Sequence, residues 1–140
     1  DVAMIRNVLA HNGGREQKVV DHLAGLVRPG GCVYLVDADG LAVRARPADP
    51  DLEDLQSRYC GLHAARGNDI QVGLRLAELL EAAGLEVISF TGRYAIVPMP
   101  AGARGPAWAA RTALIEAGMA DTADDRLRGS PTVVRRPRRR

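Results

Sequence analysis

Polar side chains follow two short apolar runs of the sequence, and their types suit the binding of a small ligand. Arg6 and Asn7 come directly after residues 2–5, and Asp37 comes directly after residues 32–36. Ligands of open α/β sheets bind at the carboxyl ends of parallel strands, so we expect these side chains to share one edge of a sheet. The alternative for Arg6 is an ion pair with a surface carboxylate, and the sequence leaves both roles open.

His11 lies a few residues beyond the first of these runs. An imidazole titrates near neutral pH, so it can serve as a general base toward a hydroxyl or an amine. Packing at the rim of the sheet is an equally good account of His11. We therefore assign it to a binding site and assign no residue to catalysis.

Asp37 and Asp39 stand one residue apart at the end of the second apolar run. No His, Glu or third carboxylate follows at a spacing that would complete a cation site, so no metal is expected. Capping of the loop is the favoured role for this pair, and a place for Asp37 in a substrate pocket is the alternative.

Tyr59, His63 and Arg66 follow one another at helical spacing in the middle of the chain. Tyr59 is in register with Leu55 and Leu62, which favours a core position for its ring. For His63 and Arg66 the sequence leaves two roles open, a position on the solvent-exposed face of the helix or a position that covers a bound ligand.

The elements that must position these residues begin with a strand, a helix and a second strand. Continuous apolar runs at 2–5 and 32–36 are typical of parallel strands buried on both faces, and they place Cys32 inside. Between them, residues 15–27 have apolar positions at helical spacing, and Pro29, Gly30 and Gly31 end the helix. This pattern predicts a βαβ unit with a right-handed crossover.

The rest of the chain continues the alternation. Residues 50–65 and 70–83 are predicted to be helices, the second capped by Asp69 and ended by Gly84, and a further helix is predicted from Pro106 to the residue before Gly118. Residues 85–90 and 94–97 are predicted to be strands. The fold class is therefore α/β, with a mainly parallel sheet and flanking helices.

Composition excludes several classes of protein. The 140 residues contain no apolar stretch long enough to cross a membrane and no pattern of a secretory signal, so we expect a soluble, cytoplasmic protein with no membrane partner. Two cysteines without ligand spacing indicate neither a disulfide framework nor a zinc site. The last 15 residues carry seven arginines and no acid, whereas residues 1–125 hold 12 basic against 17 acidic groups.

Four stretches of the sequence resemble one family in their order and spacing. They are DVAMIRNVLAH (1–11), LAGLVRPGGCVYLVDAD (23–39), RGNDIQVGLRLAELLEAAGLEV (66–87) and GPAWAARTALIEAGMAD (105–121). The set resembles the second half of a class I S-adenosylmethionine-dependent methyltransferase, of the small-molecule type found in ubiquinone and menaquinone biosynthesis. The resemblance implies a partial Rossmann-like methyltransferase fold over residues 1–121, with the first three strands missing, and a basic, poorly ordered tail over 122–140.

The resemblance also implies roles for the residues considered above. Ile5, Arg6, Asn7 and His11 would border S-adenosylmethionine, and Asp37, Tyr59, His63 and Arg66 would border a small-molecule methyl acceptor. The glycine-rich loop that holds most of the donor in this family has no counterpart in the 140 residues, so we expect the isolated chain to be inactive. The unpaired edge of its first strand would favour association with a second copy.

The alternative is a protein of a different class. In it, the α/β body is a non-enzymatic scaffold for interactions, and the arginine-rich tail binds nucleic acid or an acidic partner through salt-dependent contacts. Arginine outnumbers lysine 18 to 1 along the whole chain, so its abundance in the tail is weak evidence for such a partner. We therefore do not expect nucleic acid to be bound.

Overall fold

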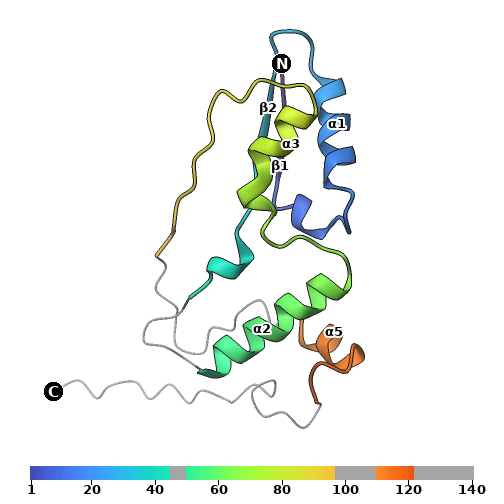
Figure 1. Ribbon diagram of the computed structural model, residues 1–140, viewed down its shortest axis with the longest axis vertical. Helices are drawn as coiled ribbons and strands as arrows, with labels where there is room; N and C mark the ends of the chain where they lie inside the picture. The colour runs from blue at the N-terminus through green and yellow to red at the C-terminus, as the bar shows by residue number, and fades with distance from the viewer. Residues whose placement is uncertain (45–49, 97–109, 122–140) are drawn as a thin grey trace, which may run out of the picture.

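The N-terminal part of the chain forms the parallel βαβ unit that the sequence predicts. A computed structural model describes residues 1–44, 50–96 and 110–121 (Figure 1). In it, β1 (Val2–Arg6) pairs in parallel with β2 (Cys32–Val36), and α1 (Glu16–Leu26) connects them. Val2 lies opposite Cys32, and Arg6 lies opposite Val36. The carboxyl ends of both strands therefore meet at the same edge, as expected.

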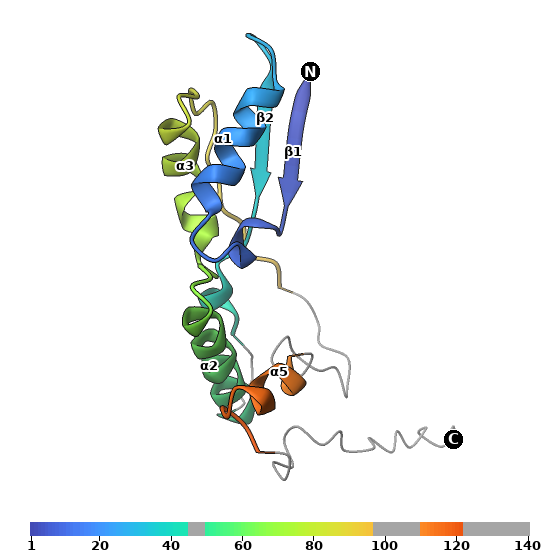
Figure 2. The same ribbon diagram turned by 90° about the vertical axis from the view of Figure 1, so that its right-hand side faces the viewer.

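Helices cover one face of this two-stranded sheet. Figure 2 shows α1 and α3 (Leu76–Ala82) on the same side of β1 and β2. The side chains of the other face are exposed, and we call Val2, Met4, Cys32 and Tyr34 the open face. The prediction that both strands are buried on both faces, with Cys32 inside, is wrong among the described residues, because no described element packs on that side.

The core lies between the sheet and the two helices. Its buried members come from α1, α3 and the two short 3₁₀ helices η1 (Leu9–His11) and η3 (Val72–Arg75). They are Leu9, Ala10, Val20, Val72, Leu76 and Leu79. Ile5 and Leu35 pack against this cluster from the covered face of the sheet. Burial of this apolar cluster holds the loop after β1 beside the segment that precedes α3.

Two α-helices come next along the described part of the chain. α2 (Pro50–Ala65) agrees with the predicted bounds. The helix predicted over 70–83 is shorter, since η3 occupies its first turn and α3 begins at Leu76. The tight approach of Gly73 to the loop after β2 accounts for this, because its N–H donates to the Ala38 carbonyl at 3.3 Å. Gly84 ends α3 with a φ of 77°, a value that glycine adopts readily.

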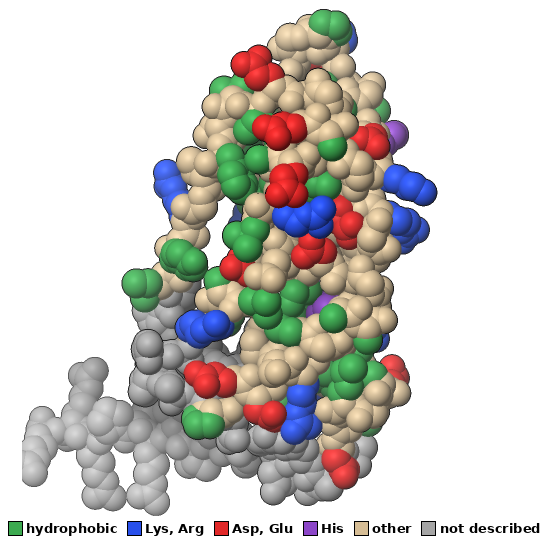
Figure 3. Space-filling model, viewed as in Figure 1, with side chains coloured by type: hydrophobic (Ala, Val, Ile, Leu, Met, Phe, Trp, Pro, Cys, Tyr) green, Lys and Arg blue, Asp and Glu red, His purple; other side chains and the backbone are tan. Residues whose placement is uncertain are grey.

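The strands predicted over 85–90 and 94–97 are not formed among the described residues 85–96. This segment is extended, but no strand among the described residues lies beside it to share a ladder. From Ile88 onward its large side chains are exposed, to 85% for Ile88 and 98% for Ile96. Figure 3 shows hydrophobic side chains along it, away from the acidic side chains that gather over α3. Val97 lies outside the described residues.

The last described helix is α5 (Arg111–Glu116), which packs on α2. The predicted helix from Pro106 is therefore described only in part, and Gly118 follows it as expected with a φ of 67°. The basic tail over 122–140 lies outside the described residues. Among the helices that are described, none has the length and apolar character to cross a bilayer. The described fold is α/β, with a small parallel sheet and flanking helices.

Candidate functional site

The chain turns sharply where β1 ends. The backbone N–H of Asn7 donates to the Val36 carbonyl at 2.9 Å, which adds one bond to the ladder beyond Arg6. Asn7 then adopts a φ of 53°, in the left-handed region that asparagine tolerates better than most residues. This turn directs the chain into η1, so Leu9 becomes buried and His11 reaches the surface.

Asp37 ties together the loops that follow the two strands. Its Oδ2 accepts a hydrogen bond from the backbone N–H of Leu9 at 2.9 Å, and its Oδ1 accepts one from the N–H of Ala38 at 2.9 Å. Both carboxylate oxygens are thus engaged by backbone donors. These contacts match the capping role favoured from sequence, and the substrate role of Asp37 stays a prediction.

Asp39 forms the next link along the same edge. Its Oδ1 accepts from the backbone N–H of Leu41 at 3.0 Å, which caps η2 (Gly40–Ala42), and from Nε2 of Gln71 at 3.2 Å. The edge of the sheet is therefore bonded to the segment that precedes η3.

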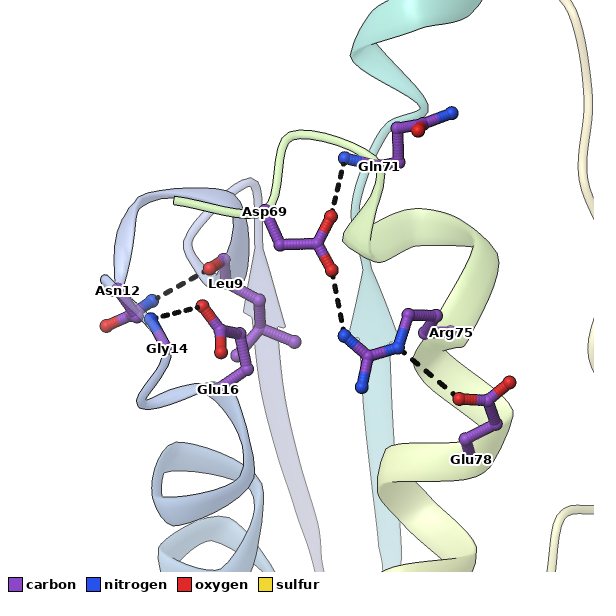
Figure 4. A network of polar contacts seen from close by, with 8 residues as sticks. All are labelled: Leu9, Asn12, Gly14, Glu16, Asp69, Gln71, Arg75 and Glu78. Atoms are coloured by element: carbon purple, nitrogen blue, oxygen red, sulfur yellow. Dashed lines mark hydrogen bonds and ion pairs between the residues drawn. The ribbon is translucent and has the colours of Figure 1, made fainter. Parts of the chain in front are cut away.

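Further hydrogen bonds and ion pairs stabilise the loop before α1 and the segment before α3 (Figure 4). Asp69 accepts from the backbone N–H of Gln71 at 3.0 Å and pairs with Arg75 at 2.9 Å. It therefore closes the turn before η3 and does not cap a helix as predicted, since α3 begins only at Leu76. On α1, buried Glu16 accepts from the Gly14 N–H at 3.1 Å. The loop after β1 and the loop after α2 are thus each stabilised by a carboxylate close in sequence, Glu16 and Asp69 respectively.

Three aromatic rings meet where the loop after β1 approaches α2. The ring centroids of His11 and His63 are 5.1 Å apart, with the planes tilted by 51°. Tyr59 meets His63 edge-on at 4.4 Å. The structure therefore brings together a residue assigned to the donor side and two residues assigned to the acceptor side. We call His11, Tyr59 and His63 the ring cluster.

The ring cluster has a distinct electrostatic environment. Burial lowers the pKa of His63 below its ordinary value, and the charges of His11 and Arg66 lower it further. Burial raises the pKa of Tyr59, as does the neighbouring Cys60. Both shifts favour the neutral form of the ring. Tyr59 also packs with Leu55 of α2, in agreement with the core position predicted for it.

Asn68 completes the site and was not singled out from the sequence as a site residue. Its Oδ1 accepts from the Gly13 N–H at 3.1 Å, and its Nδ2 lies 2.9 Å from Nδ1 of His63. The sequence signal was only that of a helix break at Gly67, Asn68 and Asp69. No local pattern reports a contact between residues 55 positions apart in the chain.

The remaining assigned residues lie outside the ring cluster. Ile5 packs against the core from within β1, opposite Leu35 of β2. Arg6 is exposed and forms no ion pair with any residue the structure describes, so the surface pairing considered from sequence is not seen there. Arg66 is also exposed, directly after α2.

Two surface hollows lie away from the ring cluster. One of about 480 Å³ lies between α2 and α5, and one of about 440 Å³ lies between η2 and α2, beside Cys60. None of the assigned site residues lines either hollow. Within the described ranges, no group of three or more His, Cys, Asp or Glu side chains is placed to hold a metal ion.

Comparison of the chain with protein-family models, with curated proteins and with solved structures finds no match in any of the three.

Proposed function

We propose that the chain forms the acceptor-side part of a class I S-adenosylmethionine-dependent methyltransferase with a partial Rossmann-like fold, acting on a small molecule. The four stretches of sequence that resemble this family support the proposal. The parallel pairing of β1 and β2 supports it as well, since it gathers the loops after both strands at one edge. In α/β sheets, this is the edge at which ligands bind.

The observation that carries the proposal is the contact between His11 and His63 at 5.1 Å. The family resemblance assigns His11 to the donor and His63 to the acceptor on separate grounds. Methyl transfer needs donor and acceptor to lie side by side, so a residue assigned to each of them is expected at the same end of the sheet. The ring cluster satisfies this requirement with elements distant in sequence.

Among the described residues, Arg6 is the one whose charge and exposure suit a part of S-adenosylmethionine. Arg6 is cationic, exposed and without an ion pair among described residues, so it can receive the carboxylate of the methionine moiety. S-Adenosylmethionine supplies an electrophilic methyl group on a sulfonium sulfur. Arg6 would bind one end of this molecule, while the ring cluster would orient the acceptor and keep water from it. Alignment is the main contribution expected of these residues.

Isothermal titration calorimetry with S-adenosylmethionine tests the proposal. We expect no binding by the 140-residue chain and binding once the coding sequence immediately upstream of Asp1 is added. In that longer protein, Arg6→Gln should weaken donor binding about tenfold, as expected for loss of one charged hydrogen bond. Arg93→Gln, at an exposed arginine of the extended segment, is the matched control and should bind as the parent does. Absence of donor binding by the longer protein would contradict the proposal.

A further inference from the structure

The side-chain amide of Asn68 has only one orientation that satisfies its neighbours. The backbone N–H of Gly13 can only donate, so the Asn68 oxygen must face it, at 3.1 Å. The amide nitrogen then faces Nδ1 of His63, at 2.9 Å. An amide nitrogen can only donate, so Nδ1 must accept with its lone pair. The proton of the neutral imidazole is therefore on Nε2.

We propose that Asn68 is a positioning residue that holds His63 as the neutral Nε2–H tautomer, so that His63 donates a hydrogen bond to an oxygen of the methyl acceptor. This inference rests on the proposed function for the identity of the ligand. It assigns His63 the role of a fixed donor in place of a general base, because the lone pair that a base would need is already bonded to Asn68.

The groups around His63 oppose its protonation. His11 approaches it from η1, and Tyr59 and Arg66 belong to its own helix and its end. None of these groups is a carboxylate. A proton on Nδ1 would point at the amide hydrogens of Asn68, and its charge would be close to that of Arg66. The lowered pKa of His63 agrees with this arrangement.

The Nε2–H group is free to meet a ligand. His63 is buried to all but 7% of its surface, yet Nε2 has no hydrogen-bond partner among described residues. No described side-chain nitrogen or oxygen is fully buried without a partner, so Nε2 must reach solvent. A donor beside the cationic Arg66 suits an oxygen with free lone pairs and negative charge. The acceptor class is therefore a molecule with an ionised hydroxyl or a carbonyl next to the methylated atom.

Nitrogen-15 NMR of the histidine rings tests the tautomer without any donor or substrate. The wild-type chain should show His63 as Nε2–H. In Asn68→Asp, one carboxylate oxygen accepts from Gly13 and the other accepts from Nδ1–H, so the proton moves to Nδ1 and the pKa of His63 rises by about one pH unit or more. Gln17→Glu makes the same amide-to-carboxylate change on α1, where the side chain hydrogen-bonds only to Asp21 and Leu79 among described residues, and should leave His63 unchanged.

A wild-type Nδ1–H tautomer, or an Asn68→Asp spectrum identical to wild type, would overturn the assignment. Asn68→Ala provides a second test of the His63 tautomer if the aspartate variant does not fold. It removes the amide from Nδ1 and should give a mixture of both tautomers. An unaltered Nε2–H signal in this variant would count against a positioning role for Asn68.

Titration with 4-nitrophenol, at a pH where its hydroxyl is ionised, tests the ligand class. This probe should shift the Nε2–H signal of His63, and nitrobenzene, which lacks the oxygen, should not. Equal shifts, or none, would refute donation to an oxyanion. Both tests are independent of S-adenosylmethionine. A chain that passes them while the upstream-extended protein binds no donor would refute the proposed function alone.

Discussion

Replacement of Asp37 by asparagine should destabilise the chain because both oxygens of this carboxylate accept from backbone N–H groups. The donors are Leu9 and Ala38, each at 2.9 Å. Whichever way an asparagine amide turns, its NH₂ group meets one of these donors. A hydrogen bond to a charged group contributes about 1.5–3 kcal/mol and a neutral one about 0.5–1.5 kcal/mol, so loss of one bond and weakening of the other should cost about 1–3 kcal/mol.

Asp39→Asn is the matched control for this substitution. Only Oδ1 of Asp39 accepts, from Leu41 and Gln71, and one amide oxygen has two lone pairs to serve both donors. We expect this variant to lose about 0.5 kcal/mol. Equilibrium urea unfolding of both variants, with the free energy taken from midpoint and slope, measures the difference. An Asp37→Asn chain as stable as Asp39→Asn would refute the capping argument.

Two further predictions concern stability. The pKa of His63 is below its ordinary 6.5 in the folded chain, so the unfolded chain binds a proton at a higher pH than the folded chain does. The stability that His63 contributes is therefore fully present above about pH 6.5 and is lost as the pH falls through the lowered pKa. His63→Gln should reduce that loss in thermal unfolding scans across acidic pH. A flat wild-type profile would contradict this. Gly73→Ala would place a methyl group 2.7 Å from the Ala38 carbonyl carbon and should cost about 1–3 kcal/mol. Gly25→Ala in α1 meets no atom within 4 Å and should stabilise by about 0.5 kcal/mol. Urea midpoints in the opposite order would refute the packing argument.

Local signals account for the parts of the fold that the sequence predicted. The first βαβ unit combines apolar runs, a helix of correct spacing and a Pro-Gly-Gly turn, and each of these acts within a few residues. The strands predicted at 85–90 and 94–97 also rest on apolar residues, but neither is formed among the described residues 85–96. A strand also needs a neighbour to share its hydrogen bonds, and the pattern does not specify one.

The candidate site was predicted in pieces. His11, Tyr59 and His63 were each identified from position and residue type, yet their mutual contact depends on how η1 packs near α2. Asn68 was missed as a site residue because asparagine after glycine is a common turn signal. Its actual role depends on Gly13 and His63, which only the folded chain places on either side of its amide.

The open face gives the chain a chemical reporter of its own association. Cys32 is exposed on that face, whereas Cys60 is half-buried in α2 and burial raises its pKa. Alkylating reagents attack the thiolate, so they should modify Cys32 well before Cys60. A second copy or any other polypeptide that covers Val2, Met4 and Tyr34 would also shield the Cys32 sulfur. The rate of alkylation at one native cysteine therefore measures how much of this sheet face is occupied in solution.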